Sequence, residues 1–204
     1  MDYNAIAQSA LDAPFYAQQK RTELAWLLEF LAPRKLKNIL EIGVMKGGTI
    51  KAWTEIATKD ADIIGIDLPG GEYGGGHTED EAELIENLAK YNQTITLFEA
   101  DSHDPETRNL IQRFAPFDFI FIDGDHTFEG VVKDFQWYAP LVKRGGLVAF
   151  HDILEYKKTT VPIQVYLYWE KLRTQFPLEK IHEFIDLDYP SDHGQWGGIG
   201  VIEL

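Results

Sequence analysis

Short apolar segments alternate with segments of helical period along most of the chain, and this alternation constrains the fold more than any other feature. Buried strands are expected at residues 38–42, 63–67, 94–99, 117–123 and 147–150. Apolar side chains at helical spacing mark the intervening segments, at residues 51–57, 79–91, 105–114 and 128–138. Strands alternating with helices of this length predict right-handed crossovers and a mainly parallel sheet. We therefore expect an α/β protein with a doubly wound sheet.

The two ends of the chain depart from this alternation. After a helix expected at residues 162–174, strands are expected at residues 181–185 and 199–204 with no helix-length segment between them. Two strands joined in this way predict an antiparallel hairpin at the edge of the sheet. At the start of the chain a helix is expected at residues 23–31, ended by Pro33. We divide the chain into an N-terminal helical segment, residues 1–37, and a main domain, residues 38–204.

Charge and composition exclude several classes of protein. The chain has 33 acidic residues against 19 basic ones, a formal net charge of −14, which disfavours nucleic acid as a partner. Cysteine is absent, so disulfides, thiolate catalysis and cysteine-based metal sites are excluded. The N-terminus lacks a signal-peptide pattern, and no apolar run approaches the roughly 20 residues that span a bilayer. We expect a cytoplasmic protein without a membrane partner.

Polar groups follow each of the five expected parallel strands. In an open parallel sheet, ligands bind beyond the carboxyl ends of the strands. The residues delivered there, in strand order, are Glu41, Gly43, Gly47 and Gly48; Asp67; Asp101 and Ser102; Asp123, Asp125 and His126; and His151 and Asp152. Carboxylates and imidazoles gathered at one edge suit a polar ligand and a divalent cation.

The turn after the first strand favours a nucleoside cofactor that carries no phosphate. Glycines at positions 43 and 47 let the backbone approach a ligand closely, and Asp67 follows at about 20 residues, the distance of a ribose-binding carboxylate. Met45 stands where a dinucleotide turn needs its second glycine, and Glu41 would repel a pyrophosphate. These residues favour S-adenosylmethionine over a dinucleotide.

Three stretches carry a resemblance to a known superfamily: EIGVMKGG from Glu41, IDLPGG from Ile66, and FDFIFIDGDHTFEGVVKDFQWYAPLVKRGGLVAFHDI from Phe117. They resemble the class I S-adenosylmethionine-dependent methyltransferases, in the branch of cephalosporin hydroxylase-like and macrocin (sugar) O-methyltransferases. The resemblance runs over about residues 38–153. It implies a Rossmann-like sheet of seven strands in the order 3-2-1-4-5-7-6, with the last strand antiparallel. It also implies O-methylation of a small molecule, such as a sugar or glycoside, with a Mg²⁺ or Mn²⁺ ion.

The resemblance implies a role for each matching position. The methionine end of the cofactor is expected beside Glu41 and Gly43, the ribose at Asp67 with Leu68 nearby, and the adenine at Asp101 and Ser102; Gly47 and Asp123 are also expected to bind the cofactor. A cation is expected on Asp123, His151 and Asp152, and His126 is expected to act as the general base. These roles agree with the chemistry, because a cation and a base together activate a hydroxyl that is otherwise a poor nucleophile.

Several alternatives stay open at this point. His151 stands where catechol-type relatives have a carboxylate. It either binds the metal, which would favour manganese over magnesium, or orients Asp152 without binding a metal. His126 could instead belong to the cap of the helix that follows it. Residues 69–76, rich in glycine, form either a lid or a linker, and Asp192 and His193 are weak candidates for contact with the acceptor.

Alternatives also remain for the whole protein. A nicotinamide-dependent oxidoreductase and a non-catalytic scaffold are the competing functions. The N-terminal 37 residues are expected either to cover the cofactor or to mediate formation of a homo-oligomer.

Overall fold

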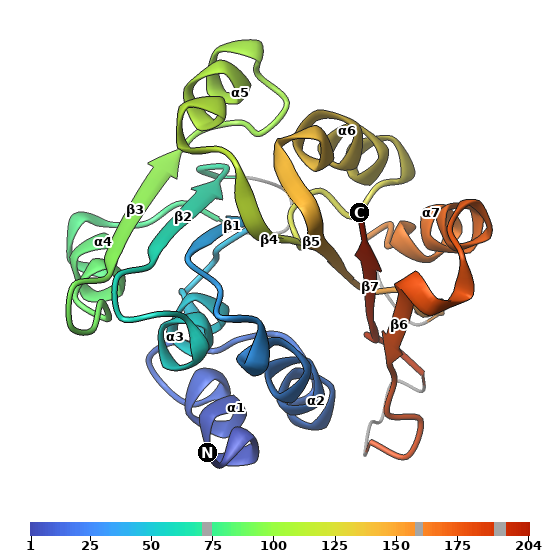
Figure 1. Ribbon diagram of the computed structural model, residues 1–204, viewed down its shortest axis with the longest axis horizontal. Coiled ribbons are helices and arrows are strands. Elements are labelled where there is room, and N and C mark those ends of the chain that lie inside the picture. Colours follow the sequence, from blue (N-terminus) through green and yellow to red (C-terminus); the bar gives the residue numbers. More distant parts are fainter. Residues whose placement is uncertain (71–74, 158–160, 190–194) are drawn as a thin grey trace.

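The computed structural model describes residues 1–70, 75–157, 161–189 and 195–204. Its strands are β1 (Asn38–Ile42), β2 (Asp62–Asp67), β3 (Thr94–Glu99), β4 (Phe117–Ile122), β5 (Val142–His151), β6 (Ile181–Phe184) and β7 (Ile199–Glu203). They form one seven-stranded sheet in the order β3-β2-β1-β4-β5-β7-β6 (Figure 1). Strands β1 to β5 run parallel, whereas β7 is antiparallel to both β5 and β6. The predicted fold class, strand order and terminal hairpin are confirmed.

Helices cover both faces of this sheet (Figure 1). They are α1 (Tyr3–Leu11), α2 (Arg21–Leu31), α3 (Gly48–Ile56), α4 (Glu79–Glu86), α5 (Pro105–Ile111), α6 (Phe128–Tyr138) and α7 (Val165–Leu172). Short 3-10 turns are η1 (Ala32–Arg34), η2 (Gln112–Phe114), η3 (Ala139–Leu141), η4 (Arg173–Gln175) and η5 (Leu178–Lys180). None of the helices that the structure describes is long and apolar enough to cross a membrane.

Some boundaries differ from those expected from the sequence, and α1 was not expected at all. Helix α4 ends at Glu86 rather than at residue 91, where Tyr91 has a left-handed backbone with φ of 57° that no helix accommodates. Helix α7 begins at Val165, three residues after the start expected at Pro162. Strand β5 is longer than expected because it begins at Val142. None of these shifts moves a residue of the strand ends.

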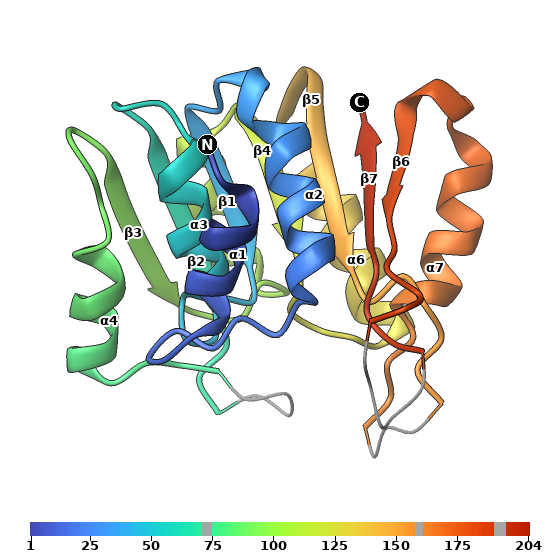
Figure 2. The same ribbon diagram turned by 90° about the horizontal axis from the view of Figure 1, so that it is seen from below.

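The sheet separates two hydrophobic cores. One lies under α1, α2 and α3, which pack together against the face formed by the central strands (Figure 2). The other lies under α5, α6 and α7 on the opposite face. Helices α1 and α2 therefore share a core with the sheet of the main domain. The division at residues 37 and 38 stays a prediction.

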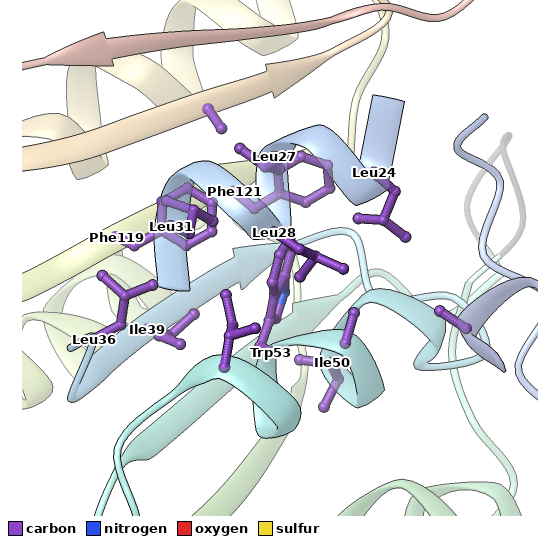
Figure 3. Packing of buried hydrophobic residues seen from close by; sticks show 14 of the residues in the cluster. Leu24, Leu27, Leu28, Leu31, Leu36, Ile39, Ile50, Trp53, Phe119 and Phe121 are labelled. Atoms are coloured by element: carbon purple, nitrogen blue, oxygen red, sulfur yellow. The ribbon is translucent and has the colours of Figure 1, made fainter. Parts of the chain in front are cut away.

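Trp53 lies at the centre of the first core (Figure 3). Its fully buried ring packs edge-on against Phe119 and Phe121, with centroids 5.3 and 5.5 Å apart. Helix α2 presents one apolar face to the same core, through Leu24, Leu27, Leu28 and Leu31. The helical spacing of these leucines explains why α2 lies flat against the sheet.

Candidate active site

A cavity of about 540 Å³ lies at the carboxyl ends of the parallel strands. Each of the strands β1 to β5 contributes a lining residue at or just after its end: Gly43, Asp67, Asp101, Asp123 and His151. The predicted rim of polar groups is thus one site. Its volume is in the range that holds a small-molecule ligand or cofactor.

Most of the predicted site residues line this cavity. They are Gly43, Asp67, Leu68, Asp101, Ser102, Asp123, His126, His151 and Asp152. Two predicted cofactor residues, Glu41 and Gly47, do not line it. Cofactor binding stays a prediction for both.

Glu41 lies behind the glycine turn rather than in the cavity. Its carboxyl group is fully buried and accepts hydrogen bonds from the Thr49 hydroxyl and the Trp53 indole N–H. Burial raises the pKa of Glu41 to about 8. Thr49, in contrast, does line the cavity. Glu41 therefore supports the start of α3, and its contact with the cofactor stays a prediction.

The raised pKa of Glu41 makes the stability of the protein depend on pH. Between pH of about 4.5 and 8 the folded protein keeps a proton on Glu41 that the unfolded chain releases, so the free energy of unfolding falls as the pH rises. Glu41→Gln removes this dependence. We expect the free energy of unfolding of the variant to rise relative to that of the wild type by up to about 1.4 kcal/mol per pH unit across this window.

Chemical denaturation at pH 5, 6, 7 and 8 measures this difference. Glu86→Gln, at an exposed position of α4, is the matched control and should follow the wild type at each pH. An identical pH slope for Glu41→Gln and the wild type would show that Glu41 is ionised in the folded protein.

Glycine is required in the turn for steric reasons that the structure makes specific. Gly43 has φ of 88°, and a Cβ there would lie 2.1 Å from the Asp123 carbonyl oxygen. Gly47 is the N-cap of α3 with φ of 77°, and a Cβ there would lie 2.6 Å from Ile85. Gly43 thus permits contact between the ends of β1 and β4, while Gly47 permits the packing of α4 on the turn.

Asp67 is tied to the glycine turn. One oxygen, Oδ2, accepts the backbone N–H groups of Val44, at 3.0 Å, and of Met45. The other, Oδ1, accepts the N–H of Gly76 at 3.3 Å. In this arrangement the carboxylate holds the end of β2 against the turn after β1. The binding of ribose by Asp67 stays a prediction.

The end of β3 rests on a buried polar network. The Ser102 hydroxyl donates to Asp134 Oδ1 at 2.8 Å, and the Tyr138 hydroxyl donates to the Ser102 carbonyl at 2.7 Å. Asp134 is fully buried on α6, and this burial raises its pKa. The His103 ring lies 3.1 Å from the same carboxyl oxygen. These contacts fix Ser102 at the cavity wall, and contact with adenine stays a prediction for it and for Asp101.

Two carboxylates and two imidazoles meet where β4 and β5 end; we name Asp123, His126, His151 and Asp152 the strand-end cluster. His126 Nε2 lies 3.3 Å from an oxygen of Asp123 and 3.3 Å from an oxygen of Asp152. His151 Nδ1 lies 3.2 Å from Asp123 Oδ1 and 3.6 Å from Asp152 Oδ1. Each imidazole therefore contacts both carboxylates.

Charge pairing shifts the pKa values within this cluster. Burial opposes ionisation, but the two imidazoles outweigh it and lower the pKa of Asp123 to about 2. The carboxylates likewise raise the pKa of His126 to about 10 and that of His151 to about 9. In this arrangement His126 donates hydrogen bonds. It accepts a proton only where another positive charge balances the two carboxylates, so its role as a base stays a prediction.

The strand-end cluster has the composition and spacing of a divalent-cation site. Single ligand atoms of Asp123, His126 and Asp152 all lie within 4.8 Å of one another. This set contains His126, whereas the family resemblance implies His151 as the third ligand. Asp152 also has a left-handed backbone with φ of 59°, a conformation that is uncommon for non-glycine residues. The carboxylates of Asp123 and Asp152 are hard oxygen ligands of the kind that magnesium prefers, whereas an imidazole ligand would favour manganese or another transition metal.

Thr127, rather than His126, caps helix α6. Its side chain accepts the N–H of Gly130 at 3.0 Å, and Asp125 accepts the N–H of Thr127 at 2.9 Å. The alternative in which His126 only caps the helix is therefore wrong. The turn holds His126 at the start of α6 with its ring over the ends of β4 and β5.

The sequence matches the model of a methyltransferase domain over residues 40–153, more than half of the chain. The chain belongs to this methyltransferase family. The class I S-adenosylmethionine-dependent methyltransferase that the resemblance implies is thereby confirmed. The matched residues include both the glycine turn and the strand-end cluster.

Two curated relatives of this methyltransferase match over part of their length. An uncharacterised protein of Acanthamoeba polyphaga mimivirus is 30% identical over 124 residues, which cover 58% of this chain and 52% of that protein. Demethylmacrocin O-methyltransferase of Streptomyces fradiae is 29% identical over 123 residues, which cover 56% of this chain and 27% of that protein. The aligned region thus spans about half of one relative and about a quarter of the other.

Solved structures share the fold of this methyltransferase. An O-methyltransferase of Bacillus cereus in complex with SAH matches with a TM-score of 0.65 and 17% identity, over 100% of this chain and 90% of that one. The MycE methyltransferase of mycinamycin biosynthesis, in complex with Mg, SAH and mycinamycin VI, matches with a TM-score of 0.64 and 17% identity, over 100% of this chain and 54% of that one. At this identity the likeness establishes the fold.

Several lining residues of the methyltransferase were not predicted. Phe15 and Gln19 come from the segment between α1 and α2, and Trp196 comes from the segment before β7. None belongs to a motif. The one signal was the length of the N-terminal segment, which is greater than a cap on the sheet requires. Asp192 and His193, and residues 71–74 of the glycine-rich loop, lie outside the described residues.

Proposed function

We propose that this methyltransferase transfers the methyl group of S-adenosylmethionine to a hydroxyl oxygen of a small, polyhydroxylated acceptor such as a sugar or glycoside. The observation that carries the proposal is the strand-end cluster, which lies in the same cavity as the glycine turn. A cofactor spanning the turn would present its sulfonium close to these carboxylates and imidazoles.

The residues of the cluster suit the chemistry of an oxygen acceptor. Methyl transfer is an in-line displacement, so the site must align the acceptor oxygen with the methyl group and remove the proton of the hydroxyl. Asp123 and Asp152 would hold a divalent cation, which lowers the pKa of a bound hydroxyl when present. His126, which contacts both carboxylates, would take the proton. His151 would hold Asp123 and Asp152 in place from the other side.

Two relatives support the acceptor class and the cation. One curated relative is named as a demethylmacrocin O-methyltransferase, and the MycE structure contains Mg together with mycinamycin VI. We extend both features to this chain as part of the proposal. We also propose that the reaction takes place in the cytoplasm, in accord with the absence of cysteine.

Transfer of a labelled methyl group tests the proposed function. The purified protein is incubated with labelled S-adenosylmethionine and a panel of glycosides, free sugars and catechols, with Mg²⁺, with Mn²⁺, or with EDTA. We expect transfer to at least one hydroxyl-bearing acceptor, a loss of transfer in EDTA, and recovery when either metal is restored. Equal transfer with and without EDTA would remove the cation from the proposal. Binding of NADH in place of the cofactor would favour an oxidoreductase.

A further inference from the structure

Gln19 lines the cavity, and its amide has a paired NH₂ group and an oxygen without a hydrogen-bond partner among the described residues. The side chain is 3% exposed, lines the cavity, and donates from Nε2 to Asp123 Oδ2 at 2.6 Å. Its Oε1 is buried and has no hydrogen-bond partner among the described residues. The neighbouring carboxylate fixes this orientation, because a carboxylate oxygen needs a donor and only the NH₂ end of the amide supplies one. Gln19 therefore offers a buried acceptor, which is costly unless a ligand pairs with it.

The segment that carries Gln19 lies directly over the glycine turn. A Cβ on Gly48, the first residue of α3, would lie 2.6 Å from the Ala10 carbonyl oxygen and 2.6 Å from Ala17. Lys51 of α3 donates to the Ser9 carbonyl at 3.0 Å. The chain between α1 and α2 is thus packed on the start of α3. Residues 15–19 of this segment line the same cavity as the glycine turn.

A buried ion pair anchors the segment immediately after Gln19. Lys20 Nζ lies 3.1 Å from Glu23 Oε1 and donates to the Asp186 carbonyl at 2.8 Å. Glu23 Oε2 accepts the N–H of Gly198 at 2.9 Å, which ties α2 to the loop before β7. Both charged side chains are at least 97% buried. Gln19 is consequently held at a fixed position beside Asp123.

The two carboxylate oxygens of Asp123 face different groups in the site. Oδ1 faces the imidazoles of His126 and His151, where the cation and the acceptor hydroxyl are proposed to lie. Oδ2 faces Gln19, on the side of the N-terminal segment and the glycine turn. The unpaired oxygen of Gln19 therefore belongs to the cofactor side of Asp123.

The donors of S-adenosylmethionine are the adenine amino group, the ribose hydroxyls and the α-ammonium group. Asp67, Asp101 and Ser102 are assigned to the first two, at the ends of β2 and β3. The amino-acid end of the cofactor then lies over the start of α3. That helix begins at Gly48 and its N-cap, Gly47, supplies no side-chain hydrogen bond, so its first N–H groups suit the α-carboxylate. Gln19 lies where the α-ammonium group needs an acceptor.

We infer that Gln19 is a cofactor-binding residue, contributed by the N-terminal segment, whose Oε1 accepts a hydrogen bond from the α-ammonium group of S-adenosylmethionine. The inference rests on the proposed function. It assigns residues 1–37 a part in covering the cofactor, one of the two roles expected from the sequence. A hydrogen bond to a charged group that replaces an unsatisfied buried acceptor is expected to contribute about 10- to 100-fold in affinity.

The affinities of two forms of the protein for two ligands together isolate the contribution of this hydrogen bond. Calorimetry measures the affinity of the wild type and of Gln19→Met for S-adenosylhomocysteine and for its deaminated analogue, which lacks only the α-ammonium group. The wild type should prefer S-adenosylhomocysteine by about 10- to 100-fold. In Gln19→Met that preference should vanish, because the acceptor is absent. Gln8→Met, an exposed change in α1 outside the cavity, is the matched control and should retain the preference.

Other outcomes overturn the inference. A preference that survives in Gln19→Met, or an equal loss for both ligands, would show that Gln19 acts only through Asp123 or not at all. A wild type that binds neither ligand would reject the proposed function itself, and is thereby distinguished from a failure of Gln19 alone. If Gln19→Met does not fold, as judged by its thermal unfolding, Gln19→Ala is tested by the same criterion.

Discussion

Trp53→Ala is expected to lower the free energy of unfolding by about 3–5 kcal/mol, the largest stability change that we predict for a single residue. The ring is fully buried between Phe119 and Phe121, and its removal leaves a cavity at the centre of the first core. Its indole N–H also donates to the buried Glu41, so the variant deprives that carboxyl group of a partner. Urea unfolding, followed by circular dichroism, measures the loss.

Trp26→Ala is the matched control, since the Trp26 side chain on α2 is 42% exposed. We expect that variant to lose at most about 1 kcal/mol. Similar losses for the two tryptophans would contradict the placement of Trp53 in the core.

His126→Gln is expected to lower the rate of methyl transfer by about 100- to 10,000-fold, the contribution of a positioned general base. Glutamine retains a donor for Asp123 and Asp152 but cannot take up a proton from the acceptor hydroxyl. The affinity for S-adenosylhomocysteine should change little, because His126 lies on the acceptor side of Asp123. Single-turnover kinetics with an acceptor found in the panel measure the rate.

His182→Gln serves as its control, because His182 lies on β6 outside the cavity, with its ring centroid 4.5 Å from that of Phe30. That variant should transfer methyl groups at the rate of the wild type. A comparable loss in both variants, or no loss in His126→Gln, would remove the general base from the mechanism.

The fold could be predicted because short segments of the sequence identify its strands and helices. Most of the parallel strands are apolar runs, each with a polar residue or a glycine at or just after its end, and the crossovers have a helical period, so the alternation identifies the architecture. The same logic placed Asp67, Asp101 and Asp123 at one edge of the sheet, where the structure has them. The strand order, in contrast, came from the family resemblance, since periodicity does not specify which strands are neighbours.

The role of a site residue could not be predicted from the sequence where contacts between distant segments of the chain determine it. Glu41 ends a strand like the other carboxylates, yet Thr49 and Trp53 of α3 enclose it on the far side of the turn. Gln19 belongs to no motif, and only the return of the N-terminal segment over α3 brings it to Asp123, which is 104 positions further along the chain. Such contacts depend on how helices pack, which no local pattern encodes.

The central claim is that the glycine turn binds an adenosyl cofactor that carries no phosphate. Isothermal titration calorimetry of the purified protein with S-adenosylhomocysteine and with NADH tests it most directly. We predict saturable binding of S-adenosylhomocysteine and no heat with NADH. Tight binding of NADH together with no binding of S-adenosylhomocysteine would contradict the account.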